Sequence, residues 1–185
     1  LAQGVVSMSL AYVAGQLVAS ASSFVFEKLL VGKLLGNPKA VLFGQPKAWK
    51  LVQRCLPSYF EPLPIATQQA ALAQGRRVGI NAAGEALFWP AFNNARATPS
   101  VQARLGDFLN LYGFCRNTAL VAFLDAAIFY WSYLLSNGPS EHLLWARVAL
   151  LVGVGMTLRY LKFYRLYAVE VFTAFAYSKE PEKQP

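Results

Sequence analysis

The sequence predicts an all-α membrane protein with three visible transmembrane spans, and three observations lead to this prediction. Residues 1–26 carry no charged side chain, and an apolar helix of about 20 residues crosses the ~30 Å hydrocarbon core of a bilayer. Two later apolar stretches, 117–135 and 143–158, carry one charge each. The chain is 56% hydrophobic and 14% charged, whereas a soluble domain is about 25% charged. Lipid is therefore expected to cover part of this protein.

The first span, residues 1–26, ends where the basic residues begin. It lacks the basic n-region and short apolar h-region of a signal peptide, so we expect it to be retained; a further span before Leu1 is compatible with the sequence. Residues 27–116 contain eleven Lys and Arg, the segment after residue 158 contains five, and residues 136–142 contain none. Because cytoplasmic segments are enriched in Lys and Arg, we expect 27–116 and the C-terminus in the cytoplasm and the loop 136–142 outside.

The basic cytoplasmic segment is expected to be helical and to lead into the second span. Its prolines between residues 37 and 97 allow only short helices between turns. The two helices predicted there cover 46–56 and 65–74.

The first of these short helices, 46–56, has a cationic face and an apolar face. Trp49 lies on the apolar face, and Lys50 and Arg54 lie on the other. A cationic amphipathic helix with a Trp suits a membrane surface. It suits equally well a surface helix that covers a small cytoplasmic core, or that binds a partner.

Residues 117–158 are expected to form a transmembrane helical hairpin. Asn137 and Gly138 supply a left-handed C-terminal cap for the second span. Pro139 prevents that helix from continuing, and Ser140 can cap the third span. A loop this short makes the second and third spans antiparallel neighbours.

Both hairpin helices are expected to extend into the cytoplasm. Thr98 and Pro99 have the residue types of an N-cap and a first helical position. Apolar residues then recur at helical spacing on both sides of the hairpin: Val101, Leu105, Phe108, Tyr112 and Cys115 before the second span, and Leu161, Tyr164, Ala168, Val171 and Phe175 after the third. Residues 159–178 form the second of these extensions, and the charged tail 179–185 is expected to be disordered.

The first span carries a small residue at every fourth position. These positions, called here the small-residue stripe, are Ser7, Ala11, Gly15, Ala19 and Ser23. In lipid, small residues allow helix backbones to approach closely, which stabilises helix pairs. The stripe predicts either packing on the second and third spans of the same chain or self-association into an oligomer.

Three polar residues interrupt the predicted spans: Gln16, Asp125 and Arg147. A charge near the middle of a span costs several kcal/mol unless it is paired or hydrated. Gln16 and Asp125 are expected at similar depth, and Arg147 somewhat nearer the outer face. They form either a polar cluster that fixes helix packing or the lining of a water-filled path in an oligomer.

Basic and aromatic residues alternate directly after the third span, at Arg159, Tyr160, Lys162 and Arg165. Such alternation can bind single-stranded nucleic acid, but beneath a span it is typical of interfacial anchors to anionic lipid. We therefore expect a lipid contact and no nucleic-acid partner.

The sequence predicts no catalytic residue, metal site or cofactor. The lone His142 has no partner for catalysis or metal binding, and no hydrolase, zinc or phosphate-loop motif is complete. Cys55 and Cys115 both fall in segments placed in the cytoplasm, where cysteines stay reduced.

A set of short motifs resembles small uncharacterised bacterial multi-pass inner-membrane proteins, some of them linked to anti-phage defence. The motifs are Tyr12-x-x-Gly15-Gln16, Ser22/Ser23, Glu27-Lys28, Gly36-Asn37-Pro38 and Leu111-Tyr112-Gly113-Phe114-Cys115-Arg116-Asn117. The resemblance spans most of the chain. It implies location in a bacterial inner membrane and assigns no catalytic residues.

These features lead to three functional hypotheses. The first is a self-associating membrane protein, a pore or membrane-perturbing effector controlled through its cytoplasmic part. The second is a non-enzymatic anchor or scaffold that docks a cytoplasmic protein. The third is a lipid-modifying enzyme that uses Asp125 or Glu85, and only those acids support it. The protein is accordingly expected not to be an enzyme.

Overall fold

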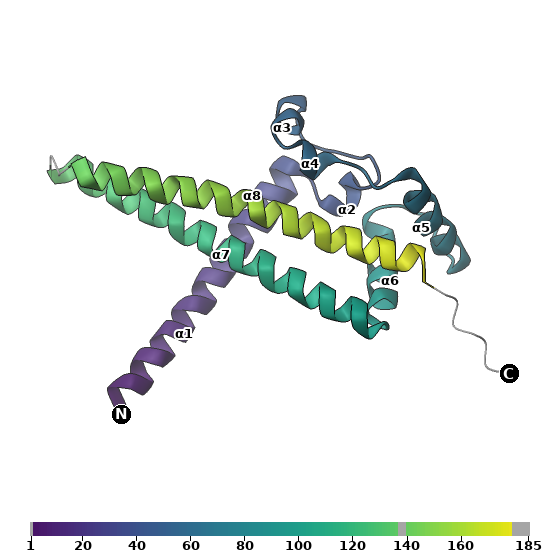
Figure 1. Cartoon of the computed structure of the whole chain (residues 1–185), viewed down its shortest axis with the longest axis horizontal. Helices are drawn as coiled ribbons and strands as arrows, with labels where there is room; N and C mark the ends of the chain where they lie inside the picture. Colours follow the sequence, from purple (N-terminus) through teal and green to yellow (C-terminus); the bar gives the residue numbers. More distant parts are fainter. Residues whose placement is uncertain (1, 137–139, 179–185) are drawn as a thin grey trace. The chain divides into compact units, whose positions relative to one another are not determined.

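The computed structural model of the chain describes residues 2–136 and 140–178, and these residues form helices and connections without a β-strand. They divide into two compact units (Figure 1). Unit 1 comprises Leu1–Val31 and Leu111–Leu161, and unit 2 comprises Gly32–Asn110 and Lys162–Pro185. The boundaries of unit 1, at 31, 111 and 161, lie close to the predicted span boundaries at 26, 117 and 158.

Among the described residues, three helical stretches are long and apolar enough to cross a membrane: Gln3–Val41, Pro99–Leu135 and Ser140–Ala176. The predicted fold class, a helical membrane protein with three spans, is therefore confirmed. The orientation of these spans and the cytoplasmic location of their extensions stay predictions.

The first helix is longer than the sequence predicts. Helix α1 (Ala2–Ser22) continues without a break into a π-helix, η1 (Ser23–Leu35). The helix thus runs past residue 26, whereas the bound of the membrane span there stays a prediction; Glu27, just beyond it, forms an ion pair with Arg116 inside unit 1. A charge next to an apolar run marks a change of environment, but it does not stop a helix whose charge is compensated.

The motif Gly36-Asn37-Pro38 ends η1 and starts the next helix. Gly36 has φ 87°, a conformation that glycine adopts readily. The side chain of Asn37 accepts a hydrogen bond from the backbone N–H of Lys39 and caps α2 (Pro38–Val41). The buried hydroxyl of Tyr59 donates to the carbonyl of Gly36 at 2.8 Å; burial raises the pKa of Tyr59, which keeps this donor protonated.

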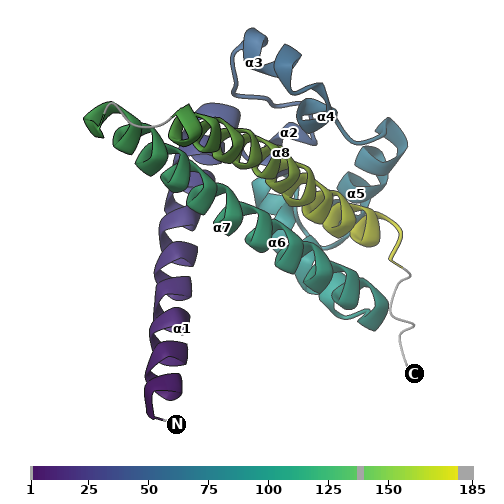
Figure 2. The ribbon, with the colours of Figure 1, turned by 60° about the vertical axis from the view of Figure 1, so that its left-hand side comes forward.

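Two long helices, α7 (Pro99–Ser136) and α8 (Ser140–Ala176), run side by side (Figure 2). The start of α7 at Pro99 and the end of α8 at Ala176 lie within two residues of the predicted bounds. The predicted turn residues 137–139 and the tail 179–185 lie outside the described residues. In unit 1 most of the buried residues of these two helices are small, and they include Ala119, Ala122, Ala126, Ala146 and Gly153. An added Cβ at Gly153 would lie only 2.8–3.1 Å from ring atoms of Phe123. Close approach of small residues thus stabilises this hairpin.

Unit 2 combines short helices with the remaining turns of α7 and α8. The helices are α2, α3 (Lys50–Cys55), α4 (Pro57–Phe60), α5 (Ile65–Arg77) and α6 (Glu85–Arg96). Their core contains the predicted apolar positions of both long helices, with Val101 and Leu105 from α7 and Ala168, Val171 and Phe175 from α8. Five of the ten predicted apolar positions thus lie in this core.

Two predictions for the proline-containing region are wrong. The helix expected over 46–56 is reduced to α3, and Trp49 precedes it as its N-cap residue. Conversely, α6 carries Pro90 in its interior, although we expected prolines to separate short helices. The loss of one backbone hydrogen bond at Pro90 is offset because α6 buries Leu87, Phe88 and Ala91 in the core.

Two glycine-to-alanine substitutions test the packing of unit 2. In Gly75→Ala, the new Cβ would lie 2.7 Å from the buried Leu87 side chain, and overpacking of this kind costs about 1–3 kcal/mol. In Gly106→Ala, the new Cβ meets no described atom within 4 Å, and alanine favours the helix by up to about 1 kcal/mol. Thermal unfolding in detergent should show a lower midpoint for Gly75→Ala only. Equal midpoints for the two variants would contradict the close contact at Gly75.

Candidate functional site

A partly buried polar network connects the first helix to α7 within unit 1. The guanidinium of Arg116 forms an ion pair with the Glu27 carboxylate and donates to the Ser22 hydroxyl (Nε to Oγ, 3.0 Å) and to the Ala19 carbonyl (3.3 Å). The Ser22 hydroxyl lies 2.5 Å from Oδ1 of Asn117, to which it donates. These five residues come from two helices and satisfy one another's hydrogen-bonding groups.

The network lies where two apolar runs end. Glu27 directly follows the uncharged run 1–26, and Arg116 directly precedes the apolar run 117–135. Ser22 is fully buried, and the Arg116 side chain is 12% exposed. A charge removed from water costs several kcal/mol unless it is paired and hydrogen-bonded. The pairing therefore fixes the register of the first helix against α7.

Aromatic rings lie beside this network. Tyr160 of α8 contacts Phe26 and Tyr112 in edge-to-face geometry, with centroid distances of 5.6 and 6.2 Å. Tyr160 is fully buried, so its predicted role as a membrane-interface anchor is wrong. Its helical position faces η1 and α7 rather than lipid.

The other residues of the predicted basic and aromatic anchor differ in their exposure. Arg159 and Lys162 are exposed. The Arg165 side chain is 16% exposed, and it donates to the Glu61 carbonyl at 2.8 Å within unit 2. Arg165 therefore contributes to the packing of unit 2, and its predicted role at the membrane interface or in partner binding stays a prediction.

The structure does not bring Gln16, Asp125 and Arg147 together. All three are exposed, and within residues 2–136 and 140–178 no hydrogen bond or ion pair joins them. Arg147 lines a groove of about 420 Å³ between α7 and α8, whose lining is almost entirely apolar. Asp125 is not among the residues of that groove.

The small-residue stripe divides into a packed part and an open part. Ala19 and Ser23 are half-buried beside the polar network, whereas Ser7, Ala11 and Gly15 are exposed. A Cβ added at Gly15 meets no described atom within 4 Å. Packing on the chain's own spans therefore covers only the C-terminal part of the stripe.

The segment around α3 is exposed and basic. Trp49 is 82% exposed and Leu51 71%, next to the exposed Lys50 and Arg54. Of the described residues, those of α3 contribute none that is buried. The predicted alternative in which this helix covers a core is not what the structure contains.

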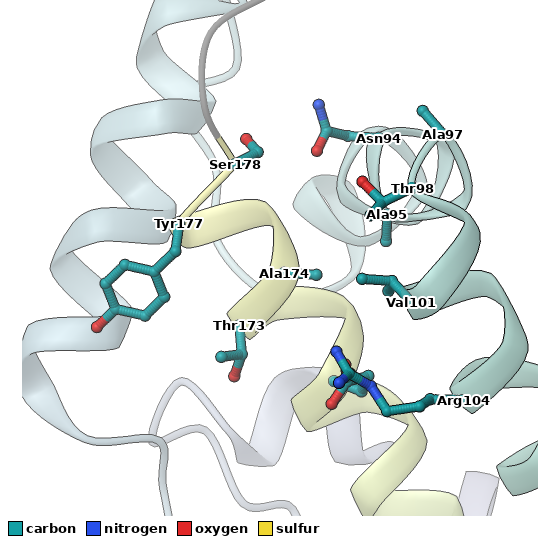
Figure 3. A pocket seen from close by; sticks show the side chains of 11 residues that line it. Asn94, Ala95, Ala97, Thr98, Val101, Arg104, Thr173, Ala174, Tyr177 and Ser178 are labelled. Atoms are coloured by element: carbon teal, nitrogen blue, oxygen red, sulfur yellow. The ribbon is translucent and has the colours of Figure 1, made fainter.

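Unit 2 contains an open cavity of about 770 Å³ (Figure 3). Thr98 and Val101 lie on one side of it, and Thr173 and Ala174 of α8 lie on the other. Arg104 reaches across to Glu170, with an Nη2–Oε1 distance of 2.6 Å. The lining of the cavity is largely apolar, and Asn94, Thr98 and Thr173 are among its polar residues. Among the described residues, no group of three His, Cys, Asp or Glu side chains is placed to hold a metal.

Local sequence patterns do not indicate that the residues of the Arg116 network form a site. Its residues stand in the motifs Ser22/Ser23, Glu27-Lys28 and Arg116-Asn117, but they are 89 to 95 positions apart. The available signal was two opposite charges, each directly beside an apolar run. That signal was interpreted only as the ends of the spans.

No protein-family model, curated protein or solved structure matches this chain. The candidate site is therefore interpreted from its own geometry.

Removal of Arg116 tests the importance of the partly buried network. Arg116→Gln should lower the free energy of unfolding by roughly 1.5–3 kcal/mol, because Glu27 and Ser22 lose a charged hydrogen-bond donor. The matched control Arg104→Gln breaks an ion pair whose arginine is 59% exposed and should cost under about 1 kcal/mol. Unfolding in mixed micelles measures both.

The double variant Glu27→Gln with Arg116→Gln should recover part of the loss, since no charge is then left without its partner. If Arg116→Gln and Arg104→Gln lower the free energy of unfolding equally, the network does not have the stabilising role assigned to it.

Proposed function

We propose that this chain is a subunit of a homo-oligomeric membrane assembly and has no catalytic role of its own. The observation that carries this proposal is the exposure of the first span. Every residue from 3 to 17 is exposed within unit 1, although α7 and α8 pack on each other in the same unit. A span with an open small-residue face is available to a neighbouring helix.

The chemistry of α1 favours a second copy of the same chain as that neighbour. Helix association in lipid depends on close backbone contact and on hydrogen bonds between helices. Ala11 and Gly15 permit close backbone contact, and the same two residues of a second copy permit it equally. The Gln16 amide is both donor and acceptor, so two copies of Gln16 can satisfy each other.

Unit 2 supplies the controlling part in this proposal. It has its own core and the cavity near Arg104, and the positive-inside rule places it in the cytoplasm. A ligand bound there can act on the membrane part through α7 and α8, which continue into unit 1. A pore or membrane-perturbing effector is the finer form of the proposal; ion conductance across a planar bilayer that holds the purified protein tests it.

A second candidate function, docking of a cytoplasmic protein by a membrane anchor, is favoured by the open cavity of unit 2. A photoreactive amino acid at Thr173, which lines the cavity, should then form an adduct of defined mass with a different chain in cells. The same group at Gln69, an exposed position of α5, is the matched control. Adducts at both positions, or at neither, would count against docking at this cavity.

Disulfide cross-linking tests self-association through the first span. In a Cys55→Ser background, where Cys115 is buried, Ala11→Cys and Gly15→Cys should form cross-linked dimers in lipid under mild oxidation. Val13→Cys and Leu17→Cys are matched controls, because a shift of two residues turns a side chain about 200° around the helix.

The controls should give several-fold less dimer, read on a non-reducing gel. Equal yields at all four positions would mean random collision, and absence of dimer at Ala11 and Gly15 would remove the first span from the interface.

A further inference from the structure

Two opposite charges in the hairpin have no ion-pair partner among the described residues of their own chain. Asp125 on α7 and Arg147 on α8 are both exposed, and in the part of the chain that the structure describes neither forms an ion pair. Both lie inside stretches apolar enough to cross a membrane. In lipid each unpaired charge costs several kcal/mol, so the membrane state requires a partner for each.

The two charges stand at nearly the same height along the hairpin. Ser132 lies 3.3 Å from His142, and Phe123 lies against Gly153. By the register that these two contacts set, residue 128 is level with Arg147. Asp125 is three residues from that level, which at the helical rise is about 4.5 Å.

The two charges nevertheless lie on different faces. Arg147 lines the apolar groove together with Ala126, Ala127, Ala146 and Leu150. Asp125 is rotated by about 150° around α7 from the mean direction of the groove residues, at 100° per residue. The two side chains therefore cannot meet within one chain without unwinding a helix.

The surroundings of the two charges are complementary in shape and polarity. Asp125 shares its face of α7 with the exposed apolar side chains of Val121, Leu124 and Ile128. The groove around Arg147 is about 420 Å³ in volume and has small alanines at its floor. One face is a ridge with an acid, and the other is a groove with a base.

We propose that the ridge of one copy docks in the groove of the next, so that Asp125 pairs with Arg147 of the neighbouring copy. This inference rests on the proposed homo-oligomer and names its second interface. All copies share one orientation in the membrane, so neighbouring copies are related by rotation about the membrane normal. This rotation leaves the height of each residue unchanged, so Asp125 of one copy can meet Arg147 of the next. Because ridge and groove lie on opposite sides of α7, each copy contacts two neighbours. The contact is head-to-tail, and it forms a ring where the rotation between neighbouring copies closes.

Charge exchange between copies tests the pairing. Asp125→Arg and Arg147→Asp should each weaken self-association in nanodiscs at least about tenfold, since each leaves like charges facing each other. An equimolar mixture of the two variants, carrying different tags, should associate again, because each variant complements the other. The double variant Asp125→Arg with Arg147→Asp should also associate. Native mass spectrometry and two-tag purification measure all four samples.

A matched control and a milder pair of variants guard against misfolding. Asp107→Arg reverses an exposed acid of the same helix in unit 2 and should leave association unchanged. Asp125→Asn and Arg147→Gln remove each charge without introducing a repulsion, and both should weaken association while the helical circular dichroism is retained.

The outcomes separate this inference from the proposed function. If the unmodified protein is a monomer in lipid, both fail. If it is an oligomer that persists in all charge variants, or if the double variant associates but the mixture does not, the pairing between copies is wrong and the oligomer stands. A dimer as the largest species would overturn the head-to-tail arrangement.

Discussion

Lipid offers no hydrogen-bonding partner, and this constraint accounts for the arrangement of the polar side chains in this protein. Where two apolar runs end, Arg116 and Glu27 neutralise each other, and Ser22 and Asn117 take up the remaining donors. The first helix can therefore pass its first charged residue and continue as η1. The same constraint makes Gln16, Asp125 and Arg147 conspicuous, because their own chain leaves them exposed.

Small residues decide which helices approach each other. Between α7 and α8 they are Ala119, Ala126, Ala146 and Gly153, with the Phe123 ring lying directly on the glycine. In unit 2 the same two helices change character and present larger apolar residues such as Val171 and Phe172 to the short helices. A continuous pair of helices thus serves two kinds of core: one closely packed with small residues, and one with larger apolar side chains.

Much of the fold follows from local patterns in the sequence. The uncharged first run, the Thr98-Pro99 start and the apolar spacing from Val101 to Phe175 are all short-range signals, and they correspond to observed helices. The failures concern contacts between distant residues. Nothing local indicates that Arg116 reaches Glu27, that Tyr160 is covered by Phe26, or that burial of Phe88 permits Pro90 inside α6. Those energies depend on tertiary neighbours and, in the proposed assembly, for Asp125 and Arg147 on a neighbouring copy.

The placement of Asp125 and Arg147 on opposite sides of one hairpin has a consequence for how an assembly grows. In the proposed arrangement, an open row of any length leaves one acid at one end and one base at the other, both facing lipid. Only closure removes these two ends together, so partial rows are disfavoured and the last subunit is bound more tightly than the first. Assembly of this kind is all-or-none in subunit number and depends steeply on protein concentration in the membrane.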